Sequence, residues 1–121
     1  MPVVLARALR IETINDVATV MIPRWSALPA GRIDIFSTGL ENQEAVSVHI
    51  VQGDSDQLDQ NRDVGLFTFD GILPAPRGTP RIQFTFEIEV DGTLRVTAEN
   101  LGTGRKVMFP LMQLEILERE S

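Results

Sequence analysis

Hydrophobic and polar residues alternate along most of this chain, which is the two-residue period of a β-strand with one buried and one solvent-facing side. The clearest case is residues 81–90, in which the apolar residues share one parity: Ile82, Phe84, Phe86, Ile88 and Val90. Asp91-Gly92 then favours a tight hairpin turn, and residues 94–99 form the partner strand. The same alternation predicts six further strands, at residues 9–13, 17–22, 32–38, 45–52, 64–69 and 106–109.

Turn-forming residues separate these eight predicted strands, and no segment before Pro110 has the 3.6-residue period of an amphipathic helix. Without helices to connect parallel strands, an α/β fold is disfavoured. We therefore expect an all-β fold, an antiparallel β-sandwich of two four-stranded sheets. A length of 121 residues suits one compact core, so we expect a single domain over residues 1–121.

Composition narrows the classes of function. The chain is 43% hydrophobic and 23% charged, which is ordinary for a globular protein and excludes wholesale disorder. Its net charge of −6 repels phosphate backbones and anionic lipids, so we expect neither a nucleic-acid nor a membrane partner. The chain has no cysteine and no apolar run of about 18 residues. We therefore expect a soluble, cytoplasmic protein.

Residues that commonly carry catalysis are scarce. The single histidine, His49, lies within a predicted strand, where a lone histidine is usually solvated or hydrogen-bonded. The acidic loop at residues 54–56 lacks the glycine and glutamate of a calcium loop, and no glycine-rich phosphate loop occurs. We therefore expect no catalytic residues, no metal site, no cofactor and no enzymatic activity. The residues by themselves indicate binding through a sheet edge or a groove.

Residues 72–98, ILPAPRGTPRIQFTFEIEVDGTLRVTA, resemble the peptide-binding β-domain of the DnaK-type, seventy-kilodalton heat-shock chaperones. The resemblance rests on the PAPRG loop, the long strand after it and the Asp-Gly hairpin. Shorter blocks match upstream in the same order, at residues 11–13, 36–38, 42–46, 48–53 and 70–72. Membership would imply a sandwich of two four-stranded sheets whose loops at one end hold an extended apolar peptide.

The resemblance also implies a pocket that takes one apolar side chain of the bound peptide. Four residues match its lining: Ile11, Phe36, Val46 and Val48. Val46 and Val48 share a parity on one predicted strand, so their placement on one wall is geometrically consistent. The alternative is that all four are ordinary core residues.

Two further groups of groove residues carry over from the family. Ile14 and Gly39 match the pair that arches over the bound backbone, and Gly39 would leave half of this arch without a side chain. The positions expected to contact the peptide main chain are Thr13, Ser37 and Gln43.

A latch between outer loops is implied as well. Arg77 matches the family's partner for an acidic group beside the groove and for the helical lid, and Glu41 occupies the acidic position. The alternative is a solvated arginine in a turn, and an exposed ion pair would contribute only about 0–1 kcal/mol.

The chain also departs from the family. Complete chaperones carry an ATPase domain before this module and a helical lid after it, and neither is within these 121 residues. We therefore expect either an excised piece or a free-standing relative. Residues 107–121 form an apolar tail that begins Val107-Met108-Phe109-Pro110-Leu111-Met112. This tail could occupy the groove of a neighbouring molecule, cap an edge strand, or form an extra strand or short C-terminal helix against the sandwich.

Two functions follow as hypotheses. The first is a chaperone-type module that binds short, extended hydrophobic segments of unfolded polypeptides. The second is a structural or assembly domain that uses the same sandwich and its apolar tail for a fixed partner or for self-association. Fold resemblance alone does not separate them, because function resides in the groove.

Overall fold

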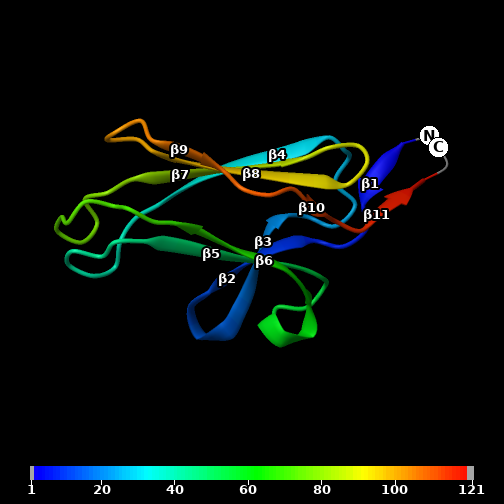
Figure 1. The fold of residues 1–121 in the computed structure, drawn as a ribbon. Helices are drawn as coiled ribbons and strands as arrows, with labels where there is room; N and C mark the ends of the chain where they lie inside the picture. Colours follow the sequence, from blue (N-terminus) through cyan, green and yellow to red (C-terminus); the bar gives the residue numbers. More distant parts are fainter. Residues whose placement is uncertain (1, 120–121) are drawn as a thin grey trace.

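The chain forms two stacked antiparallel β-sheets and a small third sheet where its two ends meet, as the computed structural model shows for residues 2–119 (Figure 1). One sheet has the order β10-β8-β7-β4, with β9 also pairing with β8; the second has the order β3-β2-β5-β6; the third joins β1 to β11. The strands are β1 (Val3–Leu5), β2 (Leu9–Thr13), β3 (Val17–Ile22), β4 (Ala30–Phe36), β5 (Val46–Gln52), β6 (Arg62–Phe69), β7 (Ile82–Ile88), β8 (Thr93–Asn100), β9 (Lys106–Met108), β10 (Met112–Gln113) and β11 (Ile116–Glu118). Two short 3-10 turns are η1 (Ile14–Asp16) and η2 (Leu58–Gln60).

The predicted antiparallel β-sandwich is confirmed, and each of the eight predicted strands is present. The expected arrangement of two four-stranded sheets needs correction. The structure adds β1, β10 and β11, so the described residues form sheets of five, four and two strands. These extra strands have two or three residues each, which is too short to display an alternating pattern.

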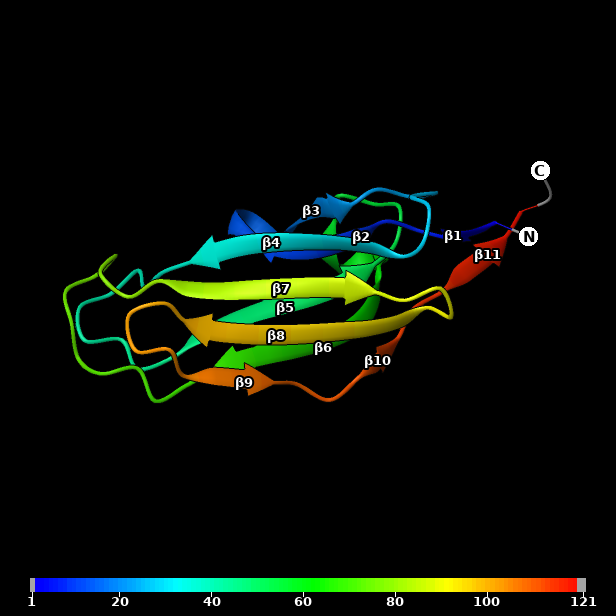
Figure 2. The ribbon, with the colours of Figure 1, turned by 90° about the horizontal axis from the view of Figure 1, so that it is seen from above.

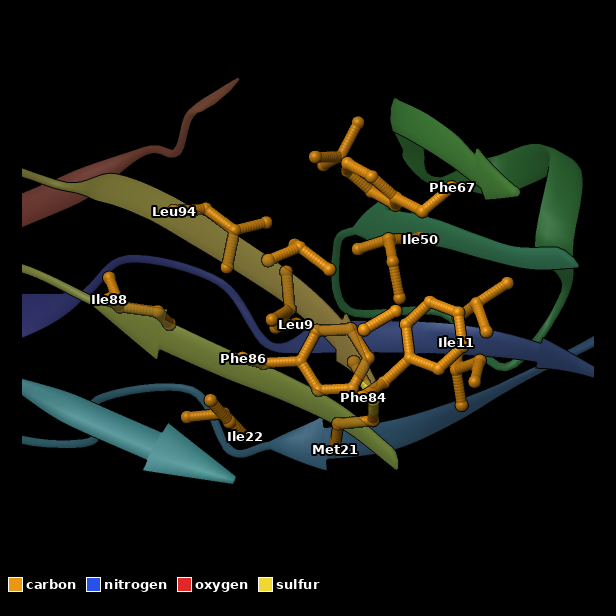
Figure 3. Packing of buried hydrophobic residues seen from close by; sticks show 14 of the residues in the cluster. Leu9, Ile11, Met21, Ile22, Ile50, Phe67, Phe84, Phe86, Ile88 and Leu94 are labelled. Atoms are coloured by element: carbon orange, nitrogen blue, oxygen red, sulfur yellow. The ribbon is translucent and has the colours of Figure 1, made fainter. Parts of the chain in front are cut away.

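The core lies between the two larger sheets. Inward-facing side chains of β7 and β8 meet those of β2, β3, β5 and β6, and Figure 3 shows this packing for ten labelled residues. Phe84 lies near its centre, edge-to-face with Phe36 at 5.4 Å between ring centroids and stacked on Phe109 at 6.2 Å. Gly92 has φ +87° in the predicted hairpin turn. β7 ends at Ile88, so Val90 is exposed rather than on the predicted buried face.

The apolar tail belongs to the fold of its own chain. β9 and β10 pair with the edge of β8, and β11 pairs with β1 beside the N-terminus (Figure 2). Leu114 is buried at 3% exposure. Edge capping and the extra strand are therefore confirmed among the alternatives for the tail, whereas the residues up to Arg119 form no C-terminal helix.

Candidate functional site

β2 and β5 pair over three residues and then separate. Their ladder runs from Leu9 opposite Gln52 to Ile11 opposite Ile50, although β2 continues to Thr13 and β5 starts at Val46. Figure 1 shows the β2–β3 hairpin turning away from β5. We call this divergence, between residues 12–13 and 46–49, the fork. Its two facing strand edges carry backbone N–H and C=O groups that are not used in the ladder.

The four predicted pocket residues belong to the hydrophobic core or pack against it. Ile11 is the last residue of β2 that pairs with β5, and Val46 and Val48 lie on the inward side of β5, at 5% and 2% exposure. Phe36, half-buried at the end of β4, packs against the same cluster from the opposite sheet. All four residues therefore contribute to the one hydrophobic core between the sheets. A pocket that admits a side chain requires Val46 and Val48 to be uncovered and stays a prediction.

The two predicted arch residues lie on different loops. Ile14 is in η1, where Asn15 and Asp16 adopt left-handed φ of 62° and 60°, a backbone region that these two residue types tolerate. The Ile14 side chain is 82% exposed, which is unusual for isoleucine. Gly39 lies in the loop after β4, and a Cβ built on it would meet no atom within 4 Å. The space above Gly39 is therefore open.

The side chain of Gln43 organises the loop that contains Gly39. Its Oε1 accepts hydrogen bonds from the N–H groups of Gly39 at 3.0 Å and Leu40 at 3.2 Å, and its Nε2 donates to the Ala45 carbonyl at 2.6 Å. Gln43 therefore fixes the conformation of this loop, and its predicted contact with a peptide stays a prediction.

The side chains of the other two predicted contact residues, Thr13 and Ser37, also form hydrogen bonds within the chain. The Thr13 hydroxyl lies 2.8 Å from that of Thr19 on the neighbouring strand, and the Ser37 hydroxyl donates to the Pro80 carbonyl. Both residues are exposed beside the fork or its loops. Their predicted contacts with a peptide main chain stay predictions.

Backbone hydrogen bonds, rather than an ion pair, join the loop after β4 to the PAPRG loop. The N–H of Asn42 donates to the Ala75 carbonyl at 2.9 Å, and that of Gly78 donates to the Thr38 carbonyl at 3.0 Å. Glu41 accepts a long contact of 3.5 Å from the backbone N–H of Arg77. Among residues 2–119 no ion pair joins the Arg77 guanidinium to Glu41. The latch ion pair therefore stays a prediction.

Sequence reasoning did not find a charged bridge on the outer face of the fork. His49 of β5 lies between Glu12 of β2, at 2.8 Å from Nδ1, and Asp63 of β6, at 2.9 Å from Nε2. The hydrogen bond with Glu12 is the main cause that raises the pKa of His49 above its ordinary value of 6.5; partial burial opposes it and Asp63 adds to it. The prediction that His49 is a hydrogen-bonded face residue is confirmed. The bridge depends on β5 lying between β2 and β6, and alternation within a single strand does not specify which strands are its neighbours.

This bridge makes stability depend on pH. Only the imidazolium form donates from both ring nitrogens, so folding favours protonated His49. The resulting stabilisation is fully present below the unfolded pKa near 6.5 and is lost as pH rises through the higher folded pKa. We expect at most about 1 kcal/mol, because the bridge is partly solvated. Urea unfolding between pH 6 and 9 should show this loss, and His49→Gln should flatten the profile; an equal slope in both proteins would contradict the bridge.

Two surface hollows lie near, but not inside, the predicted groove. One, of about 670 Å³, is beside η1 and the outer face of His49 and Asp63. The other, of about 520 Å³, lies between Leu73, which precedes the PAPRG loop, and Leu101 in the β8–β9 hairpin. Within residues 2–119, no three His, Asp or Glu side chains form a cluster that could hold a metal ion, and no helix is long and apolar enough to span a membrane.

Comparison with known proteins shows the family to which the sequence is similar. The family model described as "Hsp70 protein" matches residues 3–120. A chaperone protein dnaK of Guillardia theta is 43% identical over 99 residues, which are 82% of this chain and 16% of that protein. The chain belongs to the Hsp70 family. A chaperone protein dnaK of Cyanidioschyzon merolae is also similar, with 41% identity over 112 residues, 93% of this chain and 18% of that protein.

The chain spans about one sixth of the length of these Hsp70 relatives. The predicted resemblance to DnaK-type chaperones is confirmed. The absence of enzymatic activity, the cytoplasmic location and the individual peptide-binding residues stay predictions for this Hsp70 chain.

Proposed function

We propose that this chain binds short, extended, apolar segments of unfolded polypeptides at the fork between β2 and β5. The observation that carries the proposal is the early end of the β2–β5 ladder at Ile11 and Ile50. An extended peptide loses main-chain hydrogen bonds to water, and an unused strand edge replaces them without reading the sequence. Such backbone pairing makes the binding tolerant of different clients.

Affinity then comes from burying one apolar side chain of the client. Ile11, Val46 and Val48 form the wall beneath the fork, and Phe36 approaches from the other sheet. Burial of one leucine-sized side chain contributes about 1.5–3 kcal/mol before ordering costs. Val46 and Val48 are buried here, so binding of a client side chain requires them to become accessible. A net charge of −6 favours clients with basic flanks, mainly through faster encounter.

Fluorescence anisotropy with a labelled leucine-rich heptapeptide tests this proposal. The parent chain is expected to bind the peptide saturably and to bind a charged heptapeptide at least tenfold more weakly. Val46→Phe fills the wall beneath the fork and should weaken leucine-peptide binding at least tenfold, about 1.4 kcal/mol. Leu66→Phe is the matched control, because Leu66 lies on the outer face of β6 and is 65% exposed. Equal binding of both peptides, or no effect of Val46→Phe, would contradict the proposal.

Gly39→Ala provides a gain-of-function arm in the same assay. The added Cβ enters open space and Gly39 does not have a left-handed φ, so the fold should tolerate it. It supplies the missing half of the arch opposite Ile14, and we expect slower peptide dissociation with little change in association. Faster dissociation would count against the arch.

A further inference from the structure

β4 leaves one edge of the five-stranded sheet without a backbone hydrogen-bond partner among the described residues. It lies at the outer side of that sheet, whereas the tail covers the opposite edge through β9 and β10 (Figure 2). All seven residues of β4, Ala30–Phe36, pair with β7 in unbroken register. Within residues 2–119 they make no other backbone–backbone hydrogen bond. The outer edge of β4 therefore presents a straight row of unused N–H and C=O groups.

The edges of the other large sheet are protected. Residues 56 and 57 lie against β3, where the Ala18 N–H donates to the Asp56 carbonyl at 2.8 Å. β6 is irregular, because its register with β5 shifts between Ile50 and Val51. A covering loop and a bulge are two devices that discourage pairing with another chain. β4 has neither of them.

The sequence of β4 is complementary to itself in the antiparallel direction. Ile33 is the central residue of the strand, so an antiparallel copy centred there places Arg32 opposite Asp34 and Gly31 opposite Ile35. Arg32 and Asp34 already form an ion pair at 2.9 Å within one chain, and both remain partly exposed. Ile33 and Ile35 point to the other side of the sheet and are 60% and 47% exposed.

We propose that a second copy of this chain docks antiparallel on the edge of β4, about a two-fold axis at Ile33. The two five-stranded sheets then become one continuous sheet. Each Arg32 faces the Asp34 of the other copy, and the two Ile33 side chains bury one another. The proposal goes beyond peptide binding. The two can be tested separately, because Ile33, at the centre of the contact, is not among the predicted peptide-binding residues and lies in a different sheet from the fork.

The dimer is expected to be weak. One strand edge with two isoleucines per copy is small beside the roughly 1,600 Å² of a standard interface. We therefore expect association at concentrations near 100 µM rather than near 1 µM. Sedimentation velocity of the full chain should show the mass rising from 13.4 kDa towards twice that value. A single 13.4 kDa species up to about 1 mM would overturn the proposal.

Ile33→Lys locates the interface. It sets two like charges opposite each other at the centre of the contact and should leave a monomer at every concentration tested. Leu66→Lys is the matched control, since it places lysine on an exposed leucine in an edge strand of the other sheet. We expect Leu66→Lys to dimerise like the parent. A dimer that survives Ile33→Lys, or that Leu66→Lys abolishes, would overturn the assignment to β4.

Charge reversal tests the register. Arg32→Asp alone and Asp34→Arg alone each set like charges opposite one another and should be monomeric. An equimolar mixture of these two variants should form heterodimers, and the double variant R32D/D34R should form homodimers again, because both restore opposite charges across the interface. Failure of both combinations to associate would overturn the proposed register. Circular dichroism confirms that each variant folds, which matters because Arg32 also donates to the Met21 carbonyl at 3.1 Å.

Discussion

Gln52→Leu is expected to lower the free energy of unfolding by about 3 kcal/mol, although the two side chains have similar volumes. Gln52 is 1% exposed and ends β5. Its Nε2 donates to the carbonyls of Arg7 at 3.2 Å and Glu115 at 3.0 Å. Its Oε1 accepts from the Glu115 N–H at 2.8 Å and from the Arg62 guanidinium at 3.1 Å. Leucine leaves these partly buried groups without their partner.

These hydrogen bonds tie three distant segments together. Gln52 joins β5 to the connection between β1 and β2, through Arg7, and to the tail between β10 and β11, through Glu115. Each partly buried group that loses its partner costs about 1–3 kcal/mol, and partial access to water reduces the total. We therefore expect faster amide exchange in residues 114–118 of the variant, in addition to the lower stability.

Gln113→Leu is the matched control for this prediction. Gln113 also makes two side-chain hydrogen bonds, to the Asp91 and Leu114 carbonyls at 2.8 and 3.1 Å, but it is exposed. Water can replace these bonds, so we expect a loss below about 1 kcal/mol. Urea unfolding of both variants measures the difference. Equal losses in the free energy of unfolding for the two variants would contradict the prediction that the buried hydrogen bonds of Gln52 stabilise the fold more than the exposed ones of Gln113.

Strand positions could be predicted from the sequence because each strand shows its own burial pattern. Residues 82–88 alternate strictly, and β7 buries the apolar set and presents the polar set to solvent. Pairing between strands is a different kind of information. The fork depends on where β2 leaves β5, about forty residues away in sequence, and local alternation does not specify that point.

In the candidate site, too, features within one strand could be predicted and features that depend on pairing between strands could not. The family resemblance implied one wall for Val46 and Val48, their parity was consistent with it, and they do share the inward face of β5. The bridge from His49 to Glu12 and Asp63 required the registers of three strands and was not predicted. Gln52 was recognised only as part of a family block, because its burial depends on a tail more than sixty residues downstream.

The tail, residues 107–121, shows most clearly what the sequence could not predict, because its apolar composition was compatible with several structures. Its apolar residues suit a client segment held in another molecule, an edge cap or an added strand. In the structure these residues form β9, β10 and β11. The Leu114 side chain is buried, and its backbone N–H donates to the Gly92 carbonyl at 2.9 Å. The tail therefore contributes to the stability of its own chain.

Leu114→Ala is expected to cost about 3 kcal/mol and to lower Tm by roughly 10–15 °C, because a buried leucine loses its contacts and leaves a cavity. Leu117→Ala is the matched control in the same tail, and at 47% exposure it should cost less than about 1 kcal/mol. Thermal unfolding by circular dichroism measures both. If the tail instead bound a neighbouring molecule, the loss at Leu114 would grow with protein concentration. We expect the difference from the parent to be the same at low and high concentration.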